Sequence, residues 1–97
     1  MVKFVVKRGG KKVAFRPAKL VKSIAEACKD IHLPAKRAKT VVGKVSRAVL
    51  RAVAKRKTVT VAVLREKVLA NLDKIEPAVA KAFRKYEARR RARRARR

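Results

Sequence analysis

The spacing of hydrophobic residues along the chain changes after residue 16. In residues 2–16, two short valine-rich runs lie on either side of a Gly-Gly pair, which is typical of a β-hairpin because glycine accepts the positive φ angles of tight turns. From Pro17 onward, apolar residues recur every three or four positions, which is the period of an amphipathic helix. The pattern therefore predicts a small β element followed by a mainly helical remainder.

The register of the hairpin can be counted by taking Gly9 and Gly10 as a two-residue loop. The resulting cross-strand pairs are Phe4 with Phe15, Val5 with Ala14, Val6 with Val13, Lys7 with Lys12 and Arg8 with Lys11. We expect the side that carries the two phenylalanines to be buried. Like charges across the ladder repel by about a few tenths of a kcal/mol. The tip therefore either holds its basic side chains apart in water or binds an anion.

Two helices are expected next, the first from Pro17 to a turn near His32 and the second over about residues 35–56. The inner face of the second helix is predicted to consist of Ala38, Val41, Val42, Val45, Val49, Ala52 and Val53. Beside it, a basic stripe falls within about 80° of helix rotation. The stripe consists of Lys44, Arg47, Arg51 and Lys55. It suits contact with phosphates, and simple solvation is the alternative.

The remainder of the chain predicts one strand and two more helices. A short strand at 57–61 leads into a third helix that Thr60 caps. The fourth helix begins near Pro77 and has an apolar side as far as Tyr86. The arginine-rich residues 89–97 are expected to extend this helix or to order only on a polyanion.

Charge restricts the function more than any motif does. The 97 residues contain 31 Lys+Arg against 6 Asp+Glu, a net charge of +25 that disfavours a compact state unless anions neutralise it. Nucleic acid is the usual anion for such a protein. A membrane surface is disfavoured, because the sequence has no long apolar span and no amphipathic face with aromatic residues. An enzyme is not indicated, because the sequence shows neither a nucleophile with a nearby base nor a pair of carboxylates at suggestive spacing. Cys28 is predicted to be a buried thiol, and the single His32 leaves no metal site.

Three segments, taken together, resemble the ATP-cone domain: "VVKRGGKKVAFRPAKL", "TVTVAVLREKVLANL" and "AVAKAFRKYEARR". The resemblance covers nearly the whole chain. It implies a small bundle of four helices capped by a short sheet, and descent from a nucleotide sensor. The residues that match the family's pattern, and that the resemblance assigns to nucleotide phosphates, are Lys7, Arg8, Gly10 and Lys19.

The acidic positions of the family's pattern are not retained. Gly9 stands where the hairpin motif has aspartate, and Arg16 stands where an aspartate or asparagine is usual. Val61, Ala62 and Val63 follow Thr60 where acidic residues are common. Loss of acids and gain of bases weakens a site that must balance phosphate charge, magnesium and nucleobase contacts.

The sequence therefore predicts an α+β, mainly α domain over residues 1–88 with a basic tail at 89–97. We expect a sequence-tolerant, chromatin-like DNA-binding protein of the cytoplasm, associated with the nucleoid or chromosome, that is not an enzyme and needs no cofactor. Its expected partner is double-stranded DNA, and self-association is left open. The predicted DNA-binding residues are Lys7, Arg8, Lys11, Lys12, Arg16, Lys44, Arg47, Arg51, Lys55, Arg89, Arg90, Arg91, Arg93, Arg94, Arg96 and Arg97.

Two other functions stay open at this point. One is a regulator that responds to ATP or dATP, in which case ATP would be its ligand. The other is a ribosome-associated or RNA-associated basic protein, which composition cannot separate from a DNA-binding one.

Overall fold

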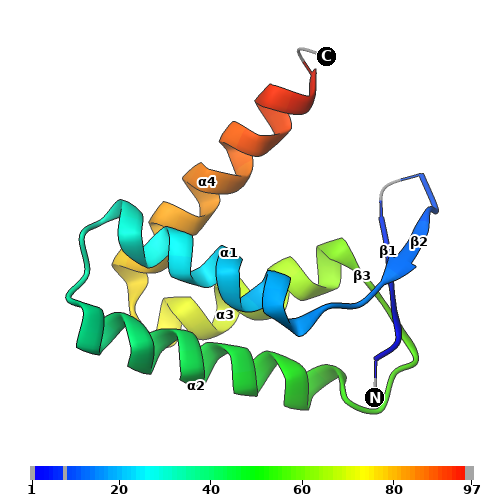
Figure 1. Ribbon diagram of the computed structural model, residues 1–97, viewed down its shortest axis with the longest axis horizontal. Coiled ribbons are helices and arrows are strands. Elements are labelled where there is room, and N and C mark those ends of the chain that lie inside the picture. The colour runs from blue at the N-terminus through cyan, green and yellow to red at the C-terminus, as the bar shows by residue number, and fades with distance from the viewer. Residues whose placement is uncertain (1, 8, 96–97) are drawn as a thin grey trace.

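A computed structural model of the protein describes residues 2–7 and 9–95, and the side chains of residues 90, 91, 94 and 95 lie outside the description. Within these residues the elements are β1 (Phe4–Val6), β2 (Lys12–Ala14), α1 (Pro17–Asp30), α2 (Ala35–Val53), β3 (Thr58–Thr60), α3 (Val61–Ile75) and α4 (Pro77–Ala95). The predicted fold class, an α+β domain that is mainly helical, is confirmed. Figure 1 shows the small sheet at one end of the helices and the end of α4 extending away from them.

The three strands form one mixed sheet with the order β2-β1-β3. β1 and β2 are antiparallel neighbours in the hairpin, whereas β3 pairs in parallel with β1 after the chain has passed through α1 and α2. The strand predicted at 57–61 is thus confirmed. Its parallel pairing places the start of α3 at the same end of the bundle as the hairpin.

The predicted hairpin register is wrong by one residue. The observed partners are Phe4 with Ala14, Val5 with Val13 and Val6 with Lys12. Lys7 donates its backbone N–H to the Lys11 carbonyl at 2.8 Å, so residues 8–10 form a three-residue loop. Gly9 and Gly10 both have positive φ angles, 86° and 84°, as a tight loop of this kind requires.

This shift of one residue turns β1 over, because side chains alternate between the two faces of a strand. Val5 is buried between Val13 and Val59 of the neighbouring strands, whereas Phe4 is 42% exposed. The expectation that the Phe4 side is buried is therefore wrong. The predicted opposition of Lys7 and Lys12 is also wrong. The Lys12 ammonium instead lies 5.6 Å from the centre of the Phe4 ring, in a cation–π contact.

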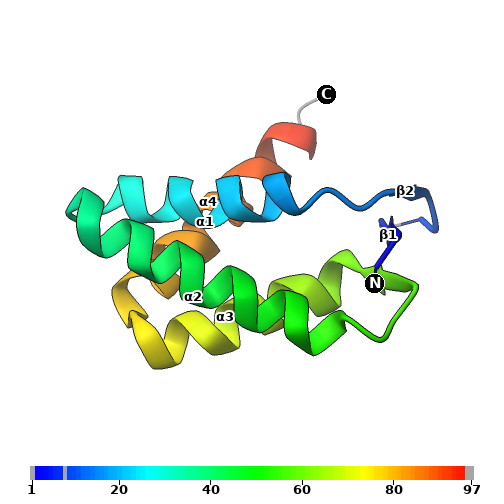
Figure 2. The same ribbon diagram turned by 60° about the horizontal axis from the view of Figure 1, so that its bottom comes forward.

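The helices enclose the main core, which they build from the apolar stripes that the sequence predicts. Figure 2 shows α1 and α2 side by side, diverging from the loop that joins them, with α3 beneath α2. The largest buried side chains of the core come from all four helices and include Ile24, Val45, Leu72 and Val79. Ala52 is exposed, and α2 ends at Val53, so the predicted inner face and the predicted end at residue 56 are wrong at these positions.

Local signals set the helix ends. The Thr60 hydroxyl accepts a hydrogen bond from the Val63 N–H at 3.1 Å, which confirms the predicted cap of α3. At the end of α1, His32 has a φ of 54° and Leu33 donates its N–H to the Cys28 carbonyl at 3.1 Å. These contacts form a Schellman turn in which histidine occupies the place that glycine usually takes. The placement of His32 in a helix-ending turn is thereby confirmed.

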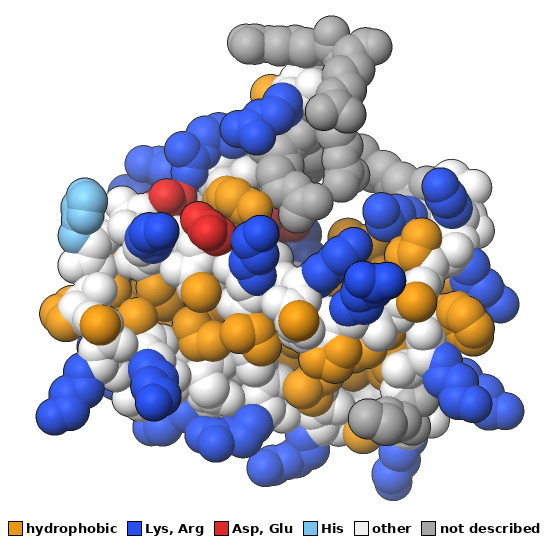
Figure 3. Space-filling view, viewed as in Figure 1, with side chains coloured by type: hydrophobic (Ala, Val, Ile, Leu, Met, Phe, Trp, Pro, Cys, Tyr) orange, Lys and Arg blue, Asp and Glu red, His pale blue; other side chains and the backbone are white. Residues whose placement is uncertain are grey.

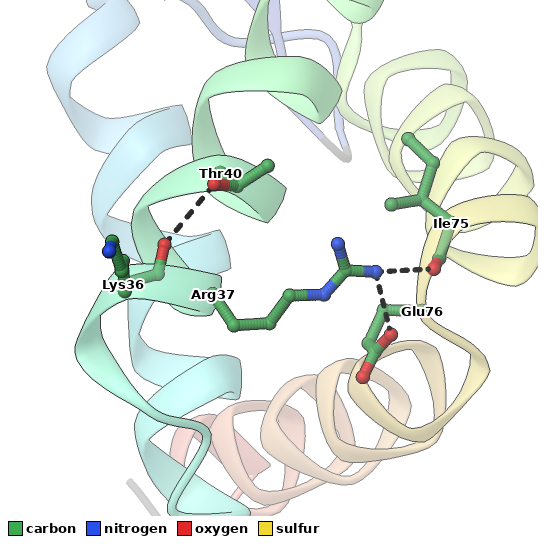
Figure 4. A network of polar contacts seen from close by, with 5 residues as sticks. All are labelled: Lys36, Arg37, Thr40, Ile75 and Glu76. Atoms are coloured by element: carbon green, nitrogen blue, oxygen red, sulfur yellow. Dashed lines mark hydrogen bonds and ion pairs between the residues drawn. The ribbon is translucent and has the colours of Figure 1, made fainter.

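Arginine–carboxylate pairs join helices at the surface. Figure 4 shows Arg37 of α2 reaching the corner between α3 and α4, where it donates to the Ile75 carbonyl at 3.2 Å and to the Glu76 carboxylate at 3.1 Å. The other pairs are Arg65 with Glu87, Arg84 with Asp73, and Arg89 with Asp30. Among the described residues, four of the six acids of the chain thus have arginine partners within the fold.

The buried thiol of Cys28 gives a pH-dependent stability that can be measured. Burial raises the pKa of the Cys28 thiol from its ordinary value of 9.0, and the negative charge of Glu76 raises this pKa further. The unfolded chain therefore releases this proton at lower pH than the folded chain does. The contribution of the thiol to the free energy of unfolding is fully present below about pH 9 and is lost as the pH rises above it.

We expect the difference in free energy of unfolding between the wild type and Cys28→Ala to be constant from about pH 6 to 8 and to shrink from about pH 9 to 10.5. Urea unfolding followed by circular dichroism measures both proteins. The variant also serves as the control, because all other ionisable groups are the same in both chains. A difference that stays constant up to pH 10.5 would contradict the shifted thiol.

Candidate functional site

Acidic residues are absent from two long parts of the chain. Residues 1–25 and 31–65 contain no Asp or Glu, so the hairpin, α2 and β3 carry only basic and neutral side chains. The acids lie in the second half of α1, in α3, at the corner between α3 and α4, and in α4, and four of the six pair with arginines that the structure describes. The surface of these acid-free elements therefore carries only positive charge. Figure 3 shows basic side chains along the lower edge of the molecule, where no acidic side chain is visible, whereas the acidic side chains lie in the upper part of the view.

The hairpin tip presents three of the predicted residues to solvent. Lys7, Lys11 and Lys12 are exposed, whereas Arg8 lies outside the described residues. Gly10 is needed for its positive φ and not for close packing, because a Cβ there would have no neighbour within 4 Å. The register places Lys12 on the face of Phe4, opposite Val6, and Lys7 at the start of the loop. The tip is an accessible cluster of ammonium groups.

The basic stripe of α2 is also accessible. Lys44, Arg47 and Arg51 are exposed on the helix, and Lys55 is exposed just beyond its end at Val53. No described acid is paired with any of them. The stripe therefore presents its full charge to solvent.

A cleft of about 420 Å³ lies between α1 and α4. Two lysines of α1, Lys19 and Lys22, face two arginines of α4, Arg89 and Arg93. The cleft is also lined by Ser23, Glu26, Asp30 and Tyr86. Four cations against two carboxylates leave the cleft with a net positive charge, and lysine and arginine side chains form strong hydrogen bonds to phosphate oxygens.

Arg89 has an internal role in this cleft. It donates to the Asp30 carboxylate at 2.6 Å and so ties the outer part of α4 to the end of α1. Of the other predicted tail residues, Arg93 is exposed, and the side chains of Arg90, Arg91, Arg94, Arg96 and Arg97 lie outside the described residues. The backbone of α4 is helical as far as Ala95, so the expectation of a helical extension is the one that holds.

The described residues assigned to a nucleotide by resemblance lie on two neighbouring elements. Lys7 and Gly10 lie in the hairpin, whereas Lys19 lies in the α1–α4 cleft. Arg16 is the exposed N-cap residue of α1 and makes no side-chain cap. Lys22 was not among the predicted site residues. The signal for it was available, because Lys19 and Lys22 are three residues apart on one helix face.

The geometry thus defines a class of protein: a four-helix α+β domain that is capped by a hairpin and has basic side chains at the hairpin tip, along α2 and in the α1–α4 cleft. The family model of the ATP cone domain matches residues 3–92 of the chain. The protein therefore belongs to the ATP-cone family, as the sequence resemblance predicts. Domains of this family are regulatory and sense nucleotides, and they are typically not catalytic.

Two further findings bear on the class. A comparison with curated proteins gives no match to this chain. Among the described residues, no helix combines the length and the apolar character that crossing a bilayer requires.

Proposed function

We propose that this member of the ATP-cone family binds double-stranded DNA through the phosphate backbone, with little preference for sequence. The observation that carries the proposal is the absence of Asp and Glu from residues 1–25 and 31–65. The basic side chains described at the hairpin tip and in the α2 stripe belong to this part of the chain and are exposed, with no carboxylate from it to neutralise them. The α1–α4 cleft and the helical extension of α4 add further cations. Each phosphate that is neutralised releases counterions, which is the main source of non-specific affinity for DNA.

The chain has few side chains of the kinds that read bases, which supports binding to DNA without sequence preference. Asn71 is the sole Asn or Gln of the chain, and its amide donates to the Lys67 carbonyl at 2.8 Å. Phe4 is 42% exposed, and the Lys12 ammonium lies 5.6 Å from the centre of its ring. Bidentate contacts to adenine and stacking on single-stranded bases therefore have few candidates, whereas contacts to phosphates have many.

A salt series tests the proposal. The dissociation constant for random-sequence duplex DNA is measured by fluorescence anisotropy from about 0.05 to 0.3 M salt, with and without ATP. We expect the logarithm of the affinity to fall linearly with the logarithm of the salt concentration, with a slope of about −0.9 for each phosphate contact. A duplex RNA of the same length is the comparison, because its groove shape and 2′-hydroxyls differ. Tighter binding to RNA would assign the protein to the RNA-associated class, and no binding at 0.15 M salt would exclude the proposal.

A regulator that responds to a nucleotide is the second candidate, and the family match over residues 3–92 favours it. Lys19, a position that matches the family's pattern, lies beside Lys22, Arg89 and Arg93 in the α1–α4 cleft and so has neighbours that suit phosphates. Titration calorimetry with ATP, GTP and inorganic triphosphate separates a base-selective site from general attraction of phosphates. A saturable site that prefers ATP, lost in Lys19→Ala, would support the regulator. Equal heats for all three ligands would leave only charge attraction.

A further inference from the structure

An apolar groove runs between α1 and α2, on the face away from the α1–α4 cleft. Figure 3 shows it as a band of hydrophobic side chains across the middle of the molecule, with basic side chains above and below. The groove has a volume of about 470 Å³. It is lined by Val21, Ala25, Ala38, Lys39, Val42, Gly43, Ser46 and Arg47. Val21, on the α1 side of the groove, is 38% exposed.

Gly43 lies in the middle of α2, where glycine is among the least favourable residues. Its φ is not in the left-handed region, so the helix backbone does not require it. A Cβ at this position would meet only the Arg47 guanidinium, at 3.8 Å, which is ordinary contact. Packing within the chain therefore gives no reason for glycine. A glycine facing an open groove does allow the backbone of another helix to approach closely.

Ser46 provides an independent sign that the groove receives a ligand. The residue is only 6% exposed, and its hydroxyl has no hydrogen-bond partner. Ser46 also lines the groove. A buried polar group without a partner is unfavourable and uncommon in folded proteins. The hydroxyl oxygen has almost no accessible surface, so a group that enters the groove would displace neighbouring side chains to bond to it, and this bond would remove the penalty.

The charges around the groove indicate the chemistry of what enters it. The other helix contacts are bridged by ion pairs: α2 to the α3–α4 corner, α3 to α4, and α1 to α4. Among the described residues, the α1–α2 contact has no such pair and no carboxylate lines the groove, whose rim carries Lys39 and Arg47. Within the described part of the chain, the α1–α2 groove therefore lacks the carboxylates that form ion pairs at the other helix contacts.

We propose that the α1–α2 groove binds an acidic amphipathic helix of a partner protein. Its small apolar residues would pack on Val42 and Gly43, its flanking carboxylates would pair with Lys39 and Arg47, and a polar group would bond to Ser46. A second copy of the chain is the less favourable occupant, because two proteins of net charge +25 would meet through basic rims. The inference concerns a face other than the α1–α4 cleft and goes beyond binding to DNA.

The test uses two synthetic peptides of about five helical turns. One carries alanine and leucine on one face and glutamates on the flanks, and the other contains the same residues in scrambled order. Both have the same charge, so general attraction to a basic protein is equal for both. In fluorescence anisotropy at about 0.3 M salt, where surface charges are screened, we expect the amphipathic peptide to bind at least tenfold more tightly. Amide shifts in NMR spectra should map to α1 and α2.

Three variants locate the binding. Gly43→Leu fills the groove, and leucine is compatible with a helix. We expect this variant to bind the amphipathic peptide no more tightly than it binds the scrambled one. Ala52→Leu places the same side chain at an exposed position of the same helix and should leave the affinity unchanged. Ser46→Ala should raise the melting temperature of the free protein by about 4 °C, because it removes an unsatisfied hydroxyl, while it lowers peptide affinity several-fold.

The proposal is overturned by any of three results. Equal affinity for the two peptides would show that only charge attracts them. Full affinity in Gly43→Leu would place binding elsewhere. A dimer that sedimentation detects for the wild type and not for Gly43→Leu would assign the groove to a second copy of the chain.

Discussion

Removing residues 90–97 is expected to lower the affinity for duplex DNA roughly 100-fold at about 0.1 M salt and to flatten the salt slope by up to about 5. The deleted segment contains six arginines and no residue larger than alanine besides them. Truncation after Arg89 keeps the ion pair between Arg89 and Asp30, which the outer part of α4 uses to pack on α1. Anisotropy measurements on the full-length and truncated chains give both quantities.

The stability of the truncated chain is the control for this experiment. The buried side chains of α4 are Val79, Ala80, Ala82 and Phe83, all before the cut. Loss of like charges removes repulsion, and the cut keeps all of these core residues, so the melting temperature should change by no more than about 4 °C. A truncated chain that unfolds would show that the tail is structural. A stable truncated chain with unchanged DNA affinity would remove the tail from the binding surface.

Charge reversal on α2 is expected to have the second large effect. Lys44→Glu with Arg51→Glu replaces two exposed cations of the acid-free surface. We expect a loss of about 30-fold in affinity for duplex DNA at about 0.1 M salt, since each substitution both removes a phosphate contact and adds repulsion. Exposed substitutions of this kind change stability by about 0.5 kcal/mol or less, so the folded protein can be assayed.

A matched pair of substitutions separates position from net charge. Lys81→Glu with Lys85→Glu makes the same change in charge at exposed positions of α4, in the part of the chain that contains acids. Binding that depends on the acid-free surface loses less than about fivefold in this control. Similar losses in the two double variants would mean that total charge, and not its placement on α2, governs the affinity.

The helices were predictable because their signals are local. The apolar spacing of α1 and α2, the Pro17 and Pro77 starts and the Thr60 cap each depend on residues within one or two turns. The start of α4 at Pro77 follows directly from the prediction. The end of α2 was predicted three residues too late. The basic residues after Val53 continue the polar face of the helical pattern, but this segment has no large apolar residue whose burial would hold it in the helix.

The hairpin register was not predictable in the same way. Both a two-residue and a three-residue loop fit the sequence around the two glycines, and the choice between them reverses the faces of β1. β3 contributes to this choice, because Val59 pairs with Val5 and packs with it and Val53 in a small core beneath the sheet. A partner from residues 58–60 is outside any count made on the hairpin alone.

The candidate site shows the same division. The exposed bases of the hairpin and of α2 were identified from spacing, whereas the α1–α4 cleft joins Lys19 and Lys22 to Arg89 and Arg93 from opposite ends of the chain. The pairing of Arg89 with Asp30 and the unpartnered hydroxyl of Ser46 also depend on contacts between helices. No local pattern contains these contacts, because they require the helices to be packed first.

The sequence alone determined the net charge, the helical periods and the absence of acids from residues 1–25 and 31–65, since these properties depend on the residues themselves or on their near neighbours. Only the tertiary structure decided the strand register, the cations that share the α1–α4 cleft and the groove left open between α1 and α2. Burial and strand pairing depend on contacts between segments that are distant in the sequence. A shift of the strand register by one residue, or a helix face left uncovered, changes which side chains a ligand contacts.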